Sequence, residues 1–216
     1  FEAAMAAYLA SLKSASVAHA AVAIANPVDG DQVRMTNYHW QFSIEETRVN
    51  LGLDTLVVVN DFTSLAMALP RLGPQDFRQV GPGQAVKNSV IGLLGSGSGL
   101  GVSGLIPSGD GWTSLGSEGG HASFAPSDAR EAAVLTYMWR QFDHVSFERL
   151  LSGPGLELTY MAIAELNKTQ VKALSAPEIT RCALEDKDPL CTQTLEVFCN
   201  MLGTAASNLA LTLGAT

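Results

Sequence analysis

The sequence predicts an α/β protein of two domains, on the basis of three observations. Residues 57–59 are three valines that lead into Asn60, Asp61 and a helix-like segment, the pattern of a buried strand followed by a helix. Strand, hairpin and helix signals alternate before residue 70, as in a layered α/β domain. Residues 73–120 are rich in glycine and carry apolar segments typical of a strand meander. The 216 residues, 47% of them hydrophobic, suffice for a substantial core.

The elements of the first part follow from local signals. Apolar residues at helical spacing predict a helix over residues 1–13, and a segment dense in turn residues, 26–31, separates two short strands. Ser43 and Glu46 have the spacing of a capping box, and Gly52 is well placed to end the helix that begins there. The predicted strands are residues 17–24, 32–35 and 53–59, and a helix follows Asp61.

A break at residues 70–74 begins and ends with proline, and we expect it to divide the chain into domains 1–71 and 72–216. The first is the remainder of a small α/β domain. The second combines a glycine-rich sheet with a helical C-terminal part, because apolar runs give way to helical periodicity after Ser127. Its predicted strands are 90–94, 102–106 and 112–115, and its predicted helices are 129–142, 146–151, 156–166, 177–184 and 190–213.

Composition excludes several classes of function. The net charge of −8 provides no basic footprint for nucleic acid. The chain has no run of 18 apolar residues and no secretory signal, so we expect neither a membrane span nor export. Cys182, Cys191 and Cys199 are odd in number and lack a CxxC spacing, which is typical of reduced thiols in a cytoplasmic protein.

The loop at residues 95–101 alternates glycine with other residues and follows a predicted strand. Glycines permit positive φ and let backbone N–H groups approach a ligand closely, which favours a phosphate-binding loop. A dinucleotide motif is rejected because residues 102–106 resemble a strand and not a helix. No lysine follows as in a Walker A loop, and the serines do not fit GxSxG. The remaining alternative is a simple β-hairpin turn.

Polar residues gather at three points of the chain. Asn60 and Asp61 end a predicted buried strand, where α/β proteins place ligands, although an Asp there is also a common helix N-cap. Glu118 and His121 flank two glycines, and Glu148 lies in a predicted short helix that Ser146 could cap and that the Gly-Pro-Gly segment at 153–155 would end.

Two chemistries compete for these side chains. A metal site of His121, Glu118, Glu148 and His144 has suitable ligand types, but no HExxH or comparable spacing supports it, and we predict no metal ligands. Carboxylates, an amide and an imidazole also suit the recognition of adjacent sugar hydroxyls. With a phosphate-binding loop and an Asp able to accept a hydroxyl proton, this set indicates phosphoryl transfer to an alcohol.

Five motifs stand out along the chain: Met35-Thr36-Asn37-Tyr38-His39-Trp40, Asn60-Asp61-Phe62-Thr63, Gly97-Ser98-Gly99-Leu100-Gly101, Gly119-Gly120-His121 and Leu151-Ser152-Gly153-Pro154-Gly155-Leu156. In their order and spacing the chain resembles the bacterial glucokinase family, from about residue 17 to residue 214. The resemblance implies the hexokinase and actin-like ATPase fold, which is related to ribonuclease H, with a sugar cleft between two domains.

The resemblance also implies an activity and assigns roles. It implies phosphorylation of the glucose 6-hydroxyl by ATP, with Mg²⁺ carried by ATP, in a cytoplasmic homodimer that binds neither nucleic acid nor membrane. Asp61 matches the general base. The positions that match sugar ligands are Asn60, Glu118, His121 and Glu148, with Asn37 at the pocket's edge, and those that match a phosphate loop are Gly97, Ser98, Gly99 and Gly101.

Two family segments have no counterpart in the sequence. One is the Asp-x-Gly-Gly-Thr-Asn phosphate loop expected before residue 1, and the other is the glycine-rich adenosine segment expected after the final helix. We therefore expect a fragment that is incomplete at both ends of the fold. The alternative function is a catalytically silent sugar-binding or regulatory relative of the same fold. The presence of Asp61 favours the kinase.

Overall fold

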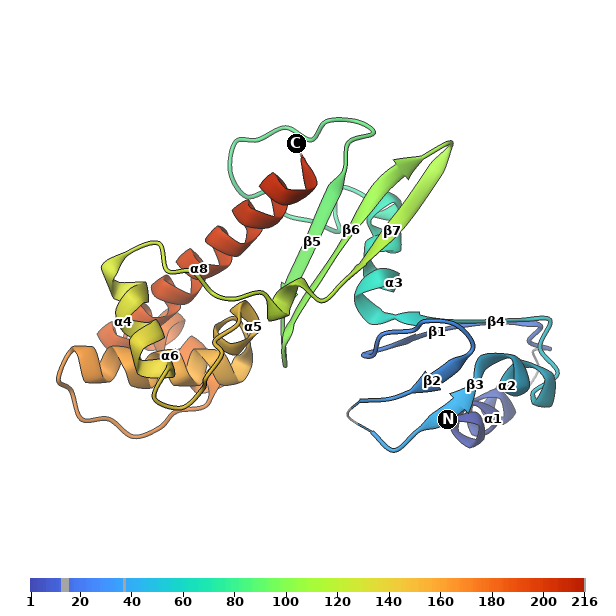
Figure 1. The fold of residues 1–216 in the computed structure, drawn as a ribbon, viewed down its shortest axis with the longest axis horizontal. Coiled ribbons are helices and arrows are strands. Elements are labelled where there is room, and N and C mark those ends of the chain that lie inside the picture. Colours follow the sequence, from blue (N-terminus) through green and yellow to red (C-terminus); the bar gives the residue numbers. More distant parts are fainter. Residues whose placement is uncertain (13–15, 37, 216) are drawn as a thin grey trace. The chain divides into compact units, whose positions relative to one another are not determined.

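The computed structural model describes residues 1–12, 16–36 and 38–215 (Figure 1). The chain divides into two compact units, Phe1–Arg78 and Gln79–Thr216. The domain boundary predicted between residues 71 and 72 lies before this division. Nowhere in the described ranges is there a helix with the length and apolar character needed to cross a membrane.

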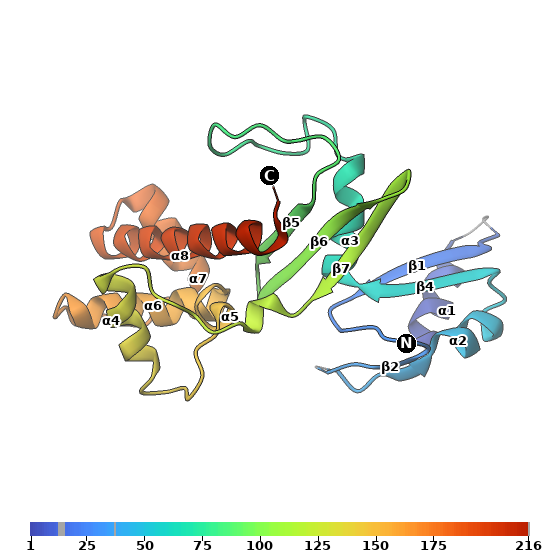
Figure 2. The same ribbon diagram turned by 45° about the horizontal axis from the view of Figure 1, so that its top comes forward.

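The first unit is built on two parallel strands. β1 (His19–Ile24) pairs with β4 (Thr55–Asn60) in a register that joins His19 to Thr55 and Ile24 to Asn60 (Figure 2). The carboxyl ends of both strands therefore meet at one edge, which is where α/β sheets place ligands. The other elements are α1 (Glu2–Ser11), β2 (Gln32–Arg34), β3 (Gln41–Ser43), α2 (Ile44–Asn50), α3 (Asp61–Ala68) and a 3₁₀ turn (Leu69–Arg71).

Local sequence explains how the elements of this unit begin and end. The Ser43 side chain caps α2 by accepting a hydrogen bond from the Glu46 N–H at 2.9 Å. Gly52 follows the helix with a φ of +64°, a left-handed conformation that costs glycine little. A core of Ile24, Val33, Leu53, Leu56 and Val58 fixes the strands against their neighbours.

The second unit begins with an antiparallel sheet of three strands in sequence order. They are β5 (Ile91–Ser96), β6 (Leu100–Ser108) and β7 (Gly111–Ser117), close to the positions predicted. α8 (Pro189–Leu213) lies beside β5 in both ribbon views (Figures 1 and 2). A glycine in β5 permits this approach, because a Cβ at Gly92 would lie 3.2 Å from the side chain of Leu209.

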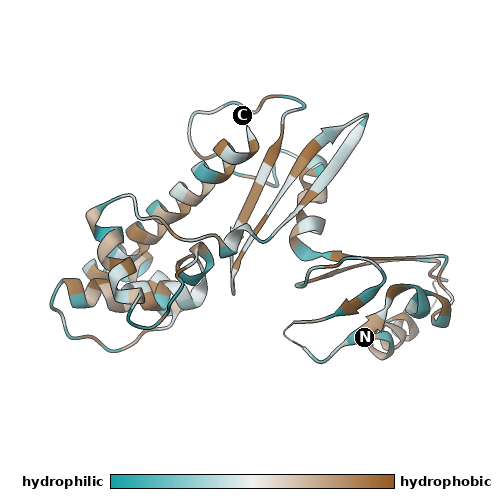
Figure 3. Ribbon diagram, viewed as in Figure 1, coloured by the Kyte–Doolittle hydropathy of each residue, from teal (hydrophilic) through white to brown (hydrophobic). Residues whose placement is uncertain are grey.

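The remaining helices form the rest of the second unit. Apolar segments run along β5, β6 and these helices (Figure 3), and fully buried side chains such as Met138, Leu150, Ile163 and Met201 form a shared core. The helices are α4 (Ala129–Met138), α5 (Phe147–Leu150), α6 (Gly153–Leu166), α7 (Ala176–Arg181), a π-helical segment (Cys182–Asp186) and α8, which ends at Gly214 with a φ of +63°.

One predicted helix boundary is wrong. The Gly-Pro-Gly segment does not end the short helix but forms the first turn of α6, because the Ser152 side chain caps that helix by accepting from the Gly155 N–H at 3.1 Å. Proline is well tolerated there, since a first-turn N–H has no partner within the helix. Gly155 is required for packing, because a Cβ there would collide with the Leu150 carbonyl oxygen.

Candidate functional site

In the first unit, the predicted base and its neighbour lie where β4 passes into α3. Asn60 is the N-cap of α3, and its Oδ1 accepts hydrogen bonds from the N–H groups of Phe62 and Thr63 at 3.0 and 3.1 Å. The interpretation of Asp61 as the cap is therefore wrong, since Asp61 is the first helical residue. The amide of Asn60 performs the capping, which leaves the carboxylate of Asp61 for another role.

The Asp61 carboxylate is held on one side only. Its Oδ1 accepts from the Phe62 N–H at 2.9 Å and from Asn60 Nδ2 at 3.1 Å. Within the described residues, every hydrogen bond recorded for this carboxylate goes to Oδ1. The side chain is half-buried. Oδ2 is therefore the oxygen available to a hydroxyl group of a ligand.

In the second unit, three predicted sugar ligands form a row. His121 Nε2 lies 3.7 Å from Glu118 Oε2, and His121 Nδ1 lies 3.8 Å from Glu148 Oε1. Glu118 and His121 are exposed, whereas Glu148 is half-buried. The imidazole therefore stands between two carboxylates, and the three groups present acceptors and donors a few ångströms apart.

Glu148 is fixed by the sheet. Its Oε2 accepts a hydrogen bond at 2.9 Å from the N–H of Leu100, the first residue of β6. Gly99 makes this contact possible, because a Cβ there would collide with the Glu148 carboxylate. Gly120 has a similar function, since a Cβ would collide with the carbonyl oxygen of Leu100. Two glycines of the predicted motifs thus allow the polar row to pack on the end of β6.

The segments that carry His121 and Glu148 are joined by backbone bonds. The Phe147 N–H donates to Ala122 O at 2.9 Å, and the Phe124 N–H donates to Val145 O at 2.9 Å. Ser146 caps α5 as predicted, by accepting from the Arg149 N–H at 3.1 Å. These bonds hold Glu148 in register with His121.

The predicted phosphate loop is a tight hairpin. Because β5 ends at Ser96 and β6 begins at Leu100, only residues 97–99 form the turn, and the Gly97 N–H donates to Gly99 O at 2.8 Å. None of Gly95, Gly97, Gly99 and Gly101 has a left-handed φ, so the argument from positive φ was wrong. Gly101 lies within β6, opposite Gly95 of β5.

The hairpin tip is anchored at the junction of α5 and α6. The Gly153 N–H donates to Gly97 O at 2.9 Å, and Ser96 Oγ donates to Leu151 O at 3.0 Å. Gly97 and Ser98 are exposed at the tip. The Leu151–Leu156 motif therefore supports the glycine motif, which explains why the two occur together in the sequence.

The structure does not assemble the metal site considered above. His144 does not join the row, because its Nε2 lies 3.0 Å from Ser123 Oγ. Across residues 1–12, 16–36 and 38–215, no group of three or more His, Cys, Asp and Glu side chains could hold a metal ion.

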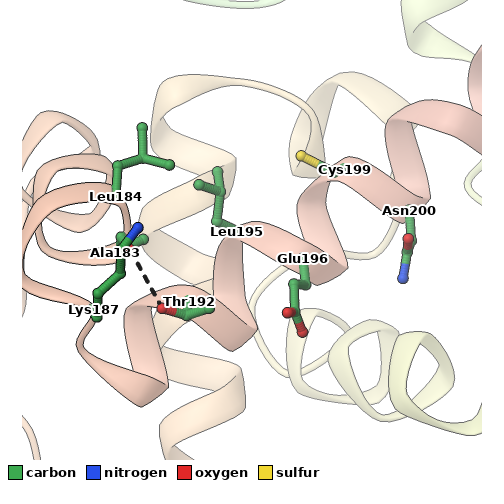
Figure 4. A pocket seen from close by; sticks show the side chains of 8 residues that line it. All are labelled: Ala183, Leu184, Lys187, Thr192, Leu195, Glu196, Cys199 and Asn200. Atoms are coloured by element: carbon green, nitrogen blue, oxygen red, sulfur yellow. Dashed lines mark hydrogen bonds between the residues drawn. The ribbon is translucent and has the colours of Figure 1, made fainter. Parts of the chain in front are cut away.

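A separate groove lies in the second unit between the π-helical segment and α8 (Figure 4). In the close-up, Lys187 directly follows the π-helical segment and Glu196 projects from α8. Thr192 Oγ1 donates to Ala183 O at 3.5 Å. None of the predicted site residues lines it. Its lining residues are Ala183, Leu184, Lys187, Thr192, Leu195, Glu196, Cys199 and Asn200.

The predicted site residues thus form two sets. Asn60 and Asp61 belong to the first unit, while the polar row and the glycine hairpin belong to the second. Asn37 lies outside the described residues. The sequence analysis missed Asn26, which it counted only as a turn residue. Its place just after β1, at the sheet edge that carries Asn60, is the signal that could have identified it.

Comparison with known proteins places these features in one family. The family model described as Glucokinase matches residues 1–216. A protein of Paraburkholderia xenovorans named bifunctional protein glk is 58% identical over 209 residues, which cover 96% of this chain and 33% of that protein. A protein of Chromobacterium violaceum named glucokinase is 51% identical over 208 residues, covering 96% of this chain and 60% of that protein.

Solved structures agree with the sequence comparison. The crystal structure of a glucokinase from an Antarctic psychrotroph aligns with a TM-score of 0.87 at 35% identity, covering 100% of this chain and 67% of that one. A glucokinase of Balamuthia mandrillaris in complex with glucose aligns with a TM-score of 0.72 at 21% identity, which is evidence for the fold alone. The chain spans about a third of the bifunctional relative and 60% of the curated glucokinase.

Proposed function

The chain belongs to the glucokinase family, and we propose that the protein containing it transfers a phosphoryl group from ATP to the 6-hydroxyl of glucose. The main support is the polar row Glu118–His121–Glu148, which the β6 backbone and two glycines hold in place. Fixed carboxylates and an imidazole at this spacing suit a ligand with adjacent hydroxyl groups. Asn60 and Asn37 complete the proposed set of sugar ligands.

Asp61 is the proposed general base. Two donors hold its Oδ1, so the carboxylate has one orientation and Oδ2 is available for the proton of the 6-hydroxyl. A carboxylate is ionised at neutral pH and is a weak base. A weak base suffices if the sugar hydroxyl loses its proton late in the reaction, when the phosphoryl group of the loose transition state bonds to the hydroxyl oxygen.

The glycine hairpin is the proposed contact for the phosphates of ATP. Its exposed tip, Gly97 and Ser98, offers backbone and hydroxyl groups without a bulky side chain, and the α5–α6 junction anchors it. Mg²⁺ would be carried with ATP, because this ion is commonly held by substrate phosphates and few protein ligands.

We also propose that the whole protein is cytoplasmic and forms a homodimer, as the family resemblance implies. The three cysteines are free thiols, which fits a reducing compartment. A catalytically silent, regulatory relative is less well supported, because Asp61 is present and oriented by its neighbours.

The test is phosphoryl transfer by the full-length protein. Purified enzyme with Mg-ATP is mixed with glucose, with mannose and with 6-deoxyglucose, while ADP release is followed and the sugar product is identified. We expect ADP and glucose 6-phosphate in equal amounts, and no sugar phosphate from 6-deoxyglucose, which lacks the acceptor hydroxyl. Absence of sugar phosphate with any hexose would contradict the proposal and favour a silent sugar-binding protein.

A further inference from the structure

Asn26 is held by four side-chain hydrogen bonds, as many as the structure shows for Asn60. It lies two residues after β1 and is only 6% exposed. Its Nδ2 donates to Pro27 O at 2.7 Å and to Arg34 O at 3.2 Å, while its Oδ1 accepts from the N–H and the hydroxyl of Thr36 at 2.7 and 2.9 Å. Both ends of the amide are therefore occupied.

These bonds require an amide at position 26. A primary amide supplies two N–H donors and an acceptor oxygen, and all three are used here. An Asp side chain would keep the acceptor but would direct a charged oxygen toward two carbonyl groups. An Ala side chain would leave the carbonyl groups of Pro27 and Arg34 and the N–H of Thr36 without these hydrogen bonds.

The backbone of Asn26 reaches the catalytic edge. Its carbonyl oxygen accepts a hydrogen bond from Asn60 Nδ2 at 3.4 Å, and the same Nδ2 donates to Asp61 Oδ1 at 3.1 Å. Asn60 Oδ1 in turn holds the first N–H groups of α3. A continuous chain of bonds therefore links Thr36, through Asn26 and Asn60, to the carboxylate of Asp61.

We propose that Asn26 is a positioning residue for phosphoryl transfer. Its side chain fixes the segment that ends at Thr36, immediately before Asn37, and its carbonyl fixes the amide that orients Asp61. The segment that ends at Thr36 and the proposed base are thereby linked by one network of hydrogen bonds. This inference rests on the proposed function, since it assigns the network a role in that reaction.

The test uses five forms of the full-length protein: wild type, Asn26→Ala, Thr36→Val, Thr36→Ser and Leu53→Ala. Leu53 is 3% exposed in the same core and precedes the N-terminal end of β4, whereas Asn60 ends that strand. Leu53→Ala is therefore the control for loss of stability without loss of the network. For each form kcat and KM for glucose, the thermal midpoint and the amide hydrogen exchange of Phe62 and Thr63 are measured.

We expect Asn26→Ala to lower kcat/KM for glucose about 100-fold, the order of loss produced by small misplacements around a reacting centre. Thr36→Val removes one bond to Asn26 and should lower it about fivefold, the equivalent of one neutral hydrogen bond. Thr36→Ser keeps the hydroxyl, so its kcat/KM for glucose should be closer to the wild-type value. Leu53→Ala should lower the thermal midpoint and leave KM close to the wild-type value.

Three results of the kinetic and thermal measurements would overturn the inference. The first is an Asn26→Ala enzyme with a lower midpoint but unchanged kcat and KM. The second is a Leu53→Ala enzyme impaired to the same degree. The third applies if Asn26→Ala does not fold: Thr36→Val and Thr36→Ser would then have the same kcat and KM for glucose.

Hydrogen exchange separates this inference from the proposed function. If wild-type protein does not phosphorylate glucose, the proposed function fails, and the role of Asn26 in that reaction fails with it. If wild type is active, faster exchange at Phe62 and Thr63 in Asn26→Ala supports the linkage from Asn26 to the Asp61 helix. Unchanged exchange at both amides would show that Asn26 does not hold that helix.

Discussion

Gly99→Ala is expected to disable the sugar site while leaving the fold intact. A Cβ at this position collides with Glu148 Oε2, the oxygen that accepts the Leu100 N–H at 2.9 Å. The obstructing atom is the end of a flexible side chain, so the carboxylate can move aside and the strands can still pair. Glu148 would then leave both Leu100 and its place beside His121.

The expected loss follows from the hydrogen bond to a sugar hydroxyl that a displaced Glu148 could no longer accept. A hydrogen bond to a charged group contributes about 1.5–3 kcal/mol, and each 1.4 kcal/mol is about a factor of ten in affinity. Glucose binding by the full-length Gly99→Ala protein should therefore be about 10- to 100-fold weaker. Isothermal titration with glucose measures this change, and the thermal midpoint reports whether the protein is folded.

Gly116→Ala is the matched control. Gly116 lies in β7 of the same sheet, has no left-handed φ, and a Cβ there would have no atom within 4 Å. This variant should bind glucose as wild type does. Wild-type affinity in Gly99→Ala would refute the assignment of Glu148 as a sugar ligand, and equal losses in both variants would show a general effect on the sheet.

Two further predictions concern the helical part of the second unit. Burial raises the pKa of the Cys191 thiol to about 12, so this thiol should react slowly at pH 8. Iodoacetamide should therefore label the exposed Cys199 and leave Cys191 unmodified until the protein unfolds, which mass spectrometry would show. Labelling of Cys191 in the folded protein would contradict its burial. Asp188 caps α8 by accepting from the Cys191 N–H at 2.8 Å, and this bond lowers the pKa of its carboxyl. Asp188→Ala should therefore reduce the free energy of unfolding by about 1 kcal/mol at pH 7. A carboxyl whose pKa is lower in the folded protein than the ordinary value of 3.8 stabilises the fold at pH values above 3.8. The difference in unfolding free energy between wild type and Asp188→Ala should therefore shrink as the pH falls below 3.8. Denaturation curves at several pH values that show no such decline would contradict the ionised cap.

Much of the fold was predictable because its signals are local. The valine run predicted β4, the spacing of Ser43 and Glu46 predicted the start of α2, and the helix predicted over residues 190–213 matches α8. The Gly-Pro-Gly segment was misinterpreted because proline and glycine occur both at the start and just after the end of helices. The side chain that decided between them, Ser152, acts only once α6 has formed.

The structure brings Glu118, His121 and Glu148 together in one row, but the sequence did not predict how they are held there. Gly99 was predicted as part of a phosphate-binding loop, and Gly120 only as a glycine between Glu118 and His121, whereas the structure gives both a packing role. They are needed because Glu148 and the Leu100 carbonyl approach them closely, and this depends on packing between distant segments. The hydrogen bonds of Asn26 were missed for a similar reason, since Asn60 becomes its neighbour only when β1 pairs with β4, and its partners Arg34 and Thr36 lie 8 and 10 residues further along the chain.

The role of Asp61 provides the most direct test of the proposed reaction. The Asp61→Asn variant of the full-length protein keeps the shape of the side chain and can still accept the Phe62 N–H, but it cannot take a proton from the sugar. Its turnover with Mg-ATP should fall by about 100- to 10,000-fold, the usual contribution of a general base, while its affinity for glucose in a calorimetric titration stays near that of wild type. Near-normal turnover with unchanged glucose binding would contradict Asp61 as the base.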